Sequence, residues 1–219
     1  MKKALLGCEV IKEELETIVG DDYPDLEIIW LGSQLHEHPD MLKEKIQATV
    51  NELDDYEMIA LSYGLCGQAT LGIEATHCDI YFPLIDDCIN GLMLCSEELP
   101  QLRASSIFTS RGWLSTSFNN SEQYIRMVEK YGEKRTRRLF ASLYKNYKNL
   151  VYMKTEDTIS ADNWAKALSQ AEIQELELIT KKASIDIYKE LIEFKQTENI
   201  GVIHKGQFIE YAMYNARKR

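Results

Sequence analysis

Several common sequence signatures are missing from this chain of 219 residues, and each absence narrows its class. No apolar run approaches the roughly 20 residues that a membrane-spanning helix needs. No G-x-G-x-x-G or P-loop pattern occurs, so the usual signatures of nucleotide binding are lacking. Positive charge is scarce: 25 Lys and Arg face 35 Asp and Glu, and the net charge of -10 argues against general nucleic-acid binding. The sequence also has no short repeat, low-complexity tract or flexible linker.

The N-terminus mimics a secretory signal without completing one. Two lysines precede a short apolar stretch that ends in Gly7-Cys8, as in a lipoprotein cleavage site. The apolar part is shorter than the roughly 7–15 residues of a signal peptide, and acidic residues follow at once. We therefore expect a cytoplasmic protein, not bound to membrane, whose five cysteines are reduced and available for metal or redox chemistry.

Apolar runs and segments of helical period alternate along the chain. Buried strands are predicted at 3–8, 26–31, 56–62, 79–85, 106–110, 150–154 and 200–203. Helical segments are predicted at 9–19, 41–53, 89–95, 121–147, 160–182 and 186–194. This alternation is typical of an α/β fold with a mostly parallel sheet flanked by helices, Rossmann-like and three-layered, with a helix-rich C-terminal half.

The domain organisation has two readings. The length fits a single α/β domain over 1–219, and the alternative is two lobes, 1–100 and 101–219. The segment 96–103, which contains Pro100, is the most plausible boundary between such lobes.

Residues that can bind metals follow the predicted strands. Cys8 ends the first strand, His36 lies in the loop after the second, Cys66 follows the third and Cys88 follows the fourth. Because the carboxyl ends of parallel strands share one edge of a sheet, where ligands bind, we expect these four side chains to gather there. Three thiolates and an imidazole can bind zinc, and three thiolates can hold an iron–sulfur cluster with one open iron. No CxxC pair supports this set, and packing in the core is the alternative for any cysteine.

Residues beside these positions are candidates for supporting roles. Gly64 and Gly67 flank Cys66 and give its loop the freedom to bend around a cofactor. Asp86 and Asp87 are candidate catalytic groups, as a general base or as partners that orient ligands. Helix capping is the alternative role for both aspartates.

Further candidates lie elsewhere in the chain. Arg111 and Trp113 follow a strand, and a cation beside an aromatic ring could bind an anionic or planar ligand, unless the ring is simply packed. His204 follows the last strand and is a further candidate for the same edge, whereas Cys78 and Cys95 are read as packing residues. Seven basic residues are spread round the predicted helix at 121–147 and just after it. They form either a solvent-exposed face or a site that binds a partner or a phosphate. They are Lys130, Lys134, Arg135, Arg137, Arg138, Lys145 and Lys148.

Seven short motifs of this chain resemble those of a known protein family. They are Gly7-Cys8, Leu35-His36-x-x-Pro39, Tyr63-Gly64-Leu65-Cys66-Gly67, Asp86-Asp87-Cys88-Ile89, Gly112-Trp113, Tyr147-x-x-Leu150-Val151-Tyr152 and Val202-Ile203-His204-Lys205-Gly206. Together they resemble an uncharacterised bacterial and archaeal family, one of the numbered domains of unknown function, over most of the chain. Members tend to have proline where this chain has Arg111 and His204-Lys205. The resemblance implies a compact α/β domain with a cysteine-based site, encoded near corrinoid-dependent methyltransferase systems.

Three functions remain open at this point. The first is a metal-binding protein of one-carbon or corrinoid-linked metabolism, in which Cys8, His36, Cys66 and Cys88 hold zinc or an iron–sulfur cluster and thiol methyl transfer is the reaction considered first. The second is a non-catalytic accessory protein that binds a corrinoid, another small molecule or a corrinoid protein. The third is thiol redox chemistry through Cys8 and Cys66. Whether the protein is an enzyme, its strand order and its oligomeric state stay open.

Overall fold

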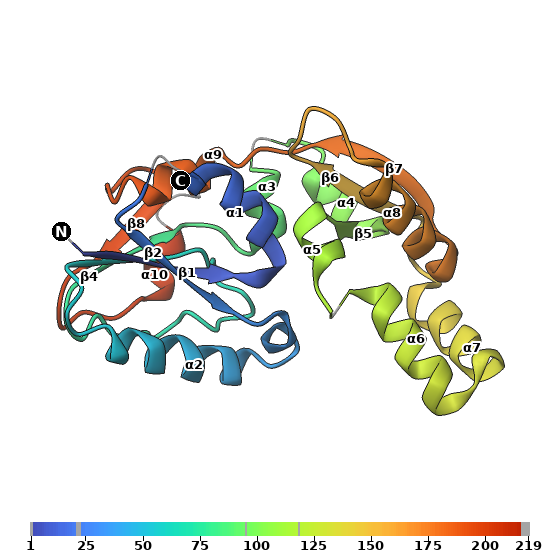
Figure 1. Ribbon diagram of the computed structural model, residues 1–219, viewed down its shortest axis with the longest axis horizontal. Coiled ribbons are helices and arrows are strands. Elements are labelled where there is room, and N and C mark those ends of the chain that lie inside the picture. Colours follow the sequence, from blue (N-terminus) through green and yellow to red (C-terminus); the bar gives the residue numbers. More distant parts are fainter. Residues whose placement is uncertain (1, 21–22, 95, 118, 216–219) are drawn as a thin grey trace. The chain divides into compact units, whose positions relative to one another are not determined.

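The computed structural model describes residues 2–20, 23–94, 96–117 and 119–215 (Figure 1). The chain divides into two compact units. The first combines Met1–Leu92 with Ile185–Arg219, and the second is Met93–Ser184. The sequence placed a boundary at 96–103, close to the first junction, and the structure then returns the chain to the first unit at Ile185.

The first unit is built on a mixed sheet of mostly parallel strands. In sheet order its strands are β2 (Leu26–Leu31), β1 (Lys3–Cys8), β3 (Met58–Leu61), β4 (Asp79–Pro83) and β8 (Ile200–Ile203). Neighbours among the first four pair in parallel, whereas β8 pairs antiparallel with β4, Ile80 lying opposite Ile203. The prediction of an α/β fold is therefore confirmed, and the strands predicted at 3–8 and 26–31 have the predicted bounds.

Helices cover both faces of this sheet. α1 (Lys12–Val19) and α9 (Asp186–Ile192) contact each other on one face, and α2 (Pro39–Glu52) lies on the other (Figure 1). The remaining helices of the unit are short: η1 (Glu9–Ile11), η3 (Ser33–Glu37), α3 (Cys88–Leu92) and α10 (Tyr211–Asn215). α2 buries Leu42, Ile46 and Val50 at helical spacing, as its sequence pattern predicts.

The second unit has a parallel sheet in the order β5 (Ser106–Thr109), β6 (Asn149–Lys154) and β7 (Glu177–Lys182). Its helices are α4 (Leu99–Ser105), α5 (Arg111–Ser115), α6 (Asn120–Tyr131), α7 (Glu133–Tyr144) and α8 (Ala161–Gln174). Leu114, Tyr152 and Ala167 form a buried cluster of this unit. None of the helices within the described ranges of either unit is both long and apolar enough to cross a membrane.

The long helical region predicted at 121–147 is helical but divided into α6 and α7, because Gly132 adopts a φ of +79° between them. The helix prediction at 160–182 is wrong in its last part. The segment 160–182 holds α8 and then β7, because Glu175 adopts a left-handed conformation (φ +56°) that ends the helix. β7 is an edge strand with partly exposed or exposed residues throughout, so its sequence lacks the apolar run of a buried strand.

Candidate functional site

Strand order brings the three predicted cysteine ligands to one edge of the first unit's sheet. β1, β3 and β4 are consecutive parallel neighbours, so their carboxyl ends lie side by side. Cys8 is the last residue of β1, Cys66 follows β3 and Cys88 begins the helix after β4. The backbone N–H of Cys8 donates to Ser62 Oγ (2.8 Å), which ties the ends of β1 and β3 together.

The loops that carry Cys66 and Cys88 are joined through their backbones. The N–H of Leu65 donates to the carbonyl of Ile85, and that of Cys66 donates to the carbonyl of Asp86, both at 2.9 Å. Gly64 permits this approach, since a Cβ at that position would lie 2.4 Å from the Ile85 oxygen. Gly64 thus holds the two cysteine loops together, whereas its predicted contact with a cofactor stays a prediction.

Cys66 occupies an unusual backbone conformation. Three successive residues have positive φ: Cys66 at +44°, Gly67 at +69° and Gln68 at +76°. For a residue other than glycine this conformation costs roughly 1–2 kcal/mol. Such strain persists where the surrounding structure enforces it, and it clusters at functional sites. The bend that the flanking glycines predicted is therefore present, and it includes the cysteine itself.

Cys8 contacts the histidine predicted to join it. Cys8 Sγ and His36 Nε2 are 3.0 Å apart. His36 lies on η3, whose first residue, Ser33, donates its N–H to Glu9 Oε2 (2.7 Å), so the loop after β2 is tied to the segment after Cys8. Burial lowers the pKa of His36. A neutral imidazole is the form that accepts a thiol proton or binds a metal.

The three thiols share one environment. Cys8 is buried, and Cys66 and Cys88 are half-buried. Burial raises the pKa of the Cys8 thiol to about 12. Burial is also the main cause that raises the pKa of Cys66, with further contributions from Cys8 and Asp87. The pKa of Cys88 is raised by burial and then by Cys8 and Cys66. The thiols are therefore close enough to act on one another, and they are protonated at neutral pH unless a cation offsets their charge.

Two groups at this site were missed by the sequence reasoning. Glu14 on α1 and Tyr188 on α9 are both fully buried. The charge of Glu14 contributes to the raised pKa of Cys88 and of Tyr188, so both groups lie near the thiols. Glu14 lies on the same helix face as Ile18. An acidic residue within this apolar stripe was the sequence feature that could have indicated its role. A fully buried glutamate is rare without a partner or a function.

Asp86 and Asp87 differ in their surroundings. Asp87 Oδ1 accepts a hydrogen bond from the N–H of Asn90 (2.8 Å), so it caps α3. Its charge still reaches the thiols of Cys66 and Cys88. Asp86 is exposed, and its backbone carbonyl accepts the N–H of Cys66. A catalytic role for either aspartate stays a prediction.

Two of the further candidates lie at the opposite edge of the sheet. Cys78 precedes β4 and so lies at its amino end. β8 runs antiparallel to β4, and this places His204 at that same amino edge, with Nδ1 3.0 Å from Asp79 Oδ2. His204 was a further candidate for the edge that holds the thiols, and the antiparallel direction of β8 instead places it at the amino edge. Cys95 lies outside the described residues.

Arg111 and Trp113 belong to the second unit. They begin α5 at the carboxyl end of β5, where the N–H of Trp113 donates to Ser110 Oγ (3.4 Å). Both side chains are half-buried. Their proposed role in binding an anionic or planar ligand stays a prediction.

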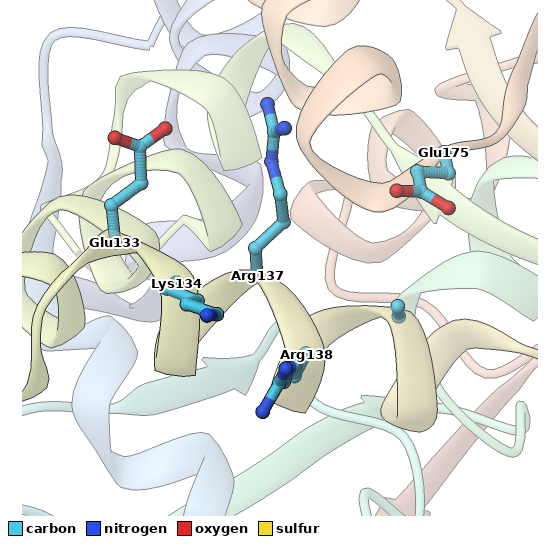
Figure 2. Close-up of a pocket in the computed structure, with 6 residues that line it drawn as sticks. Glu133, Lys134, Arg137, Arg138 and Glu175 are labelled. Carbon is cyan, nitrogen blue, oxygen red and sulfur yellow. The ribbon is translucent and has the colours of Figure 1, made fainter.

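The basic residues predicted to share one helix are divided between α6, α7 and the segment after α7. Lys134, Arg137 and Arg138 on α7 line a hollow of the second unit, and Glu133 and Glu175 line the same hollow (Figure 2). The lining therefore has mixed charge. This weakens the case for a phosphate site, and a role in binding a partner stays a prediction.

The donor set suits a thiophilic metal, although the donors are not arranged around one point. Within the described part of the chain, no three His, Cys, Asp or Glu side chains are grouped so that they could hold a metal ion. Sulfur and nitrogen ligands of one tetrahedral zinc lie roughly 3.5 Å apart, given zinc's usual bond lengths. The Cys8–His36 pair, at 3.0 Å, is already close to that separation.

Comparison with known proteins gives one match. Residues 30–192 match the family described as "Protein of unknown function (DUF1638)". The match covers most of the chain and includes His36, Cys66, Cys88 and Tyr188, whereas Cys8 and Glu14 precede it. No curated protein and no solved structure matches the chain.

Proposed function

The chain belongs to the DUF1638 family of proteins of unknown function, and we propose that it binds a thiophilic metal through Cys8, Cys66 and Cys88, with His36 as the fourth ligand. One observation carries the proposal: three cysteines follow three neighbouring parallel strands at one sheet edge, and the His36 imidazole lies 3.0 Å from the sulfur of Cys8. The mixed set of sulfur and nitrogen favours zinc, whereas an iron–sulfur cluster would use the thiolates alone.

The electrostatics of the site support a cation. After burial itself, the groups that raise the pKa of the Cys88 thiol are all ones that are anionic when ionised: Cys8, Cys66, Asp87 and Glu14. Buried charges in proteins are paired or coordinate metals, and a metal-bound thiol gives up its proton outright. A bound divalent ion would therefore lower the pKa of these thiols, which burial and the neighbouring acidic groups raise.

The finer part of the proposal concerns the reaction. When bound, zinc would supply a Lewis acid that activates a thiolate or a water molecule at neutral pH. The reaction we propose is methyl transfer to a thiol, in one-carbon or corrinoid-linked metabolism of the cytoplasm. A thiolate sulfur attacks the methyl carbon of a methylated donor such as a methylcorrinoid, the C–S bond forms as the bond from the donor to that carbon breaks, and the donor leaves with the electron pair of the broken bond. Glu14 is a fully buried acidic side chain near the thiols, and Asp87 caps the helix that carries Cys88.

Thiol redox chemistry is the weaker reading. A reactive redox cysteine needs a thiolate, and therefore a pKa below the usual value of about 8.5. Burial instead raises the pKa of Cys8 to about 12 and that of Cys66 as well. The accessory role keeps a direct test: tight binding of an added corrinoid without turnover, by protein that carries no metal, would favour it over the metal site.

Elemental analysis and an absorption spectrum of protein purified without oxygen test the proposal. We expect about one equivalent of zinc and no visible absorption, whereas iron with sulfide and a brown colour would indicate a cluster. Cys66→Ser should lose the metal, and Cys78→Ser at the opposite edge should keep it. Trace metal in the wild type, with no further loss in Cys66→Ser, would end the proposal.

A further inference from the structure

Tyr188 carries a hydroxyl group that the fold of the first unit does not use. The side chain is fully buried on α9, and its hydroxyl has no hydrogen-bond partner among the described residues. A buried hydroxyl without a partner costs about 1–3 kcal/mol. Phenylalanine would fill the same space without this cost, so packing alone does not account for a tyrosine here.

The hydroxyl lies against the helix that carries Cys88. A Cβ built on Gly91 of α3 would be 2.7 Å from the Tyr188 oxygen, so the missing side chain of Gly91 makes room for it. Cys88 is three residues before Gly91, and residues at this spacing lie on the same face of a helix. Burial is the main cause that raises the pKa of Tyr188, and the neighbouring groups that raise it further begin with the thiols of Cys88, Cys66 and Cys8.

We propose that Tyr188 is a positioning residue of the thiol site, whose hydroxyl donates a hydrogen bond to Cys88 Sγ when that sulfur binds metal. This inference rests on the proposed metal-binding function. A thiol sulfur is a weak acceptor, whereas a hydrogen bond to an ionised acceptor is about twice as strong as a neutral one. The hydroxyl therefore gains its partner in the metal-loaded protein. Hydrogen bonds of this kind orient metal ligands, and their loss typically lowers metal affinity about 10- to 100-fold.

Cobalt(II) binding to Tyr188→Phe tests the inference. Cobalt(II) takes zinc sites and reports its thiolate ligands by absorption, and chelator competition gives its dissociation constant. We expect Tyr188→Phe to weaken cobalt binding about 10- to 100-fold and to shift the thiolate-to-cobalt band. In metal-free protein the same variant should unfold at the same temperature as the wild type or higher, because it removes an unpartnered hydroxyl.

Tyr56→Phe is the matched control. Tyr56 is also nearly buried, and its hydroxyl donates to Glu27 away from the thiol edge. This variant should leave the cobalt affinity and the absorption band unchanged. If Tyr188→Phe fails to fold, Gly91→Ala replaces it, since its new methyl group displaces the Tyr188 hydroxyl and should weaken cobalt binding in the same way.

The outcomes separate the two proposals. If the wild type binds cobalt and Tyr188→Phe binds it with the same affinity and spectrum, the role of Tyr188 is overturned and the metal site stands. If Tyr56→Phe weakens binding as much as Tyr188→Phe, the effect is a general one and the role of Tyr188 is likewise overturned. If the wild type binds neither zinc nor cobalt, both proposals fall.

Discussion

The carboxyl and amino edges of the first unit's sheet hold the same kinds of residues. At the amino edge, His204 pairs with Asp79 and Lys2 pairs with Asp55, and all four side chains are at least 36% exposed. At the carboxyl edge, Cys8 is only 3% exposed and Glu14 is fully buried. The amino edge thus satisfies its polar groups with one another in contact with water. The carboxyl edge instead gathers groups that become anionic when they ionise, in a place where water cannot stabilise them.

This difference shows which feature distinguishes a candidate site from ordinary polar surface. Residue type does not distinguish them, because both edges have a cysteine, a histidine and carboxylates. Burial and backbone strain distinguish them, because fully buried polar groups and a cysteine with left-handed backbone conformation occur at the carboxyl edge. The following experiments test whether the two edges really differ in this way.

Gly64→Ala should have the largest effect on stability. A methyl group at Gly64 would meet the Ile85 carbonyl at 2.4 Å, and the backbone of two joined loops would have to separate. Overpacking of this kind costs about 3 kcal/mol of unfolding free energy, measurable by urea denaturation. Gly206→Ala, just after the amino edge, meets no atom within 4 Å and bears only the strain of its positive φ of +84°. Equal losses in the two variants would contradict the tight junction proposed for the Cys66 and Cys88 loops.

The carboxyl edge should also make the metal-free protein sensitive to base. The folded Cys8 keeps its proton up to a pKa of about 12, whereas in the unfolded chain it titrates near 9.0. Folded protein therefore holds more protons above pH 9, and the free energy of unfolding falls as the pH rises, by up to about 1.4 kcal/mol per pH unit for this thiol.

Urea unfolding between pH 8 and 10 measures this slope. Cys8→Ala should reduce the slope by the share of this one thiol and leave the shares of Cys66 and Cys88, whereas Thr49→Ala, a buried change without a titrating group, should not change it. A slope that Cys8→Ala leaves unchanged would show that the thiol is more accessible to water than the structure indicates.

Burial decides which parts of the fold and of the candidate site the sequence could predict. Continuous apolar runs located β1 and β2, and the rule that parallel strands share a carboxyl edge grouped Cys8, Cys66 and Cys88 correctly in the fold. The apolar pattern does not give the direction of a strand, so the sequence left open whether His204 lies at the thiol edge, and the antiparallel β8 places it at the other one. The edge strand β7 was read as helix because exposed lysines replace the apolar run. Glu14 and Tyr188 were missed because their importance comes from neighbours that are distant in the sequence.

Replacing Cys66 tests the strain at the carboxyl edge. Cys66→Gly and Cys66→Ala both remove the sulfur, but only glycine adopts a φ of +44° without penalty. In metal-free protein Cys66→Gly should therefore exceed Cys66→Ala in unfolding free energy by about 1 kcal/mol. Two variants of equal stability would mean that the loop relaxes, and that no strain is stored at this cysteine.

His204→Ala should have the smallest effect. The Nδ1–Oδ2 distance to Asp79 is 3.0 Å, but the histidine side chain is 64% exposed and its partner 36% exposed. When the histidine is protonated, an exposed ion pair of this kind typically contributes about 0.5 kcal/mol, and salt weakens it further. Urea unfolding at low and high salt should therefore show a small loss that disappears in salt, and the metal content should equal that of the wild type. A loss of metal in His204→Ala would break the comparison, because it would give the amino edge a part in the site that its exposed, mutually paired side chains do not indicate.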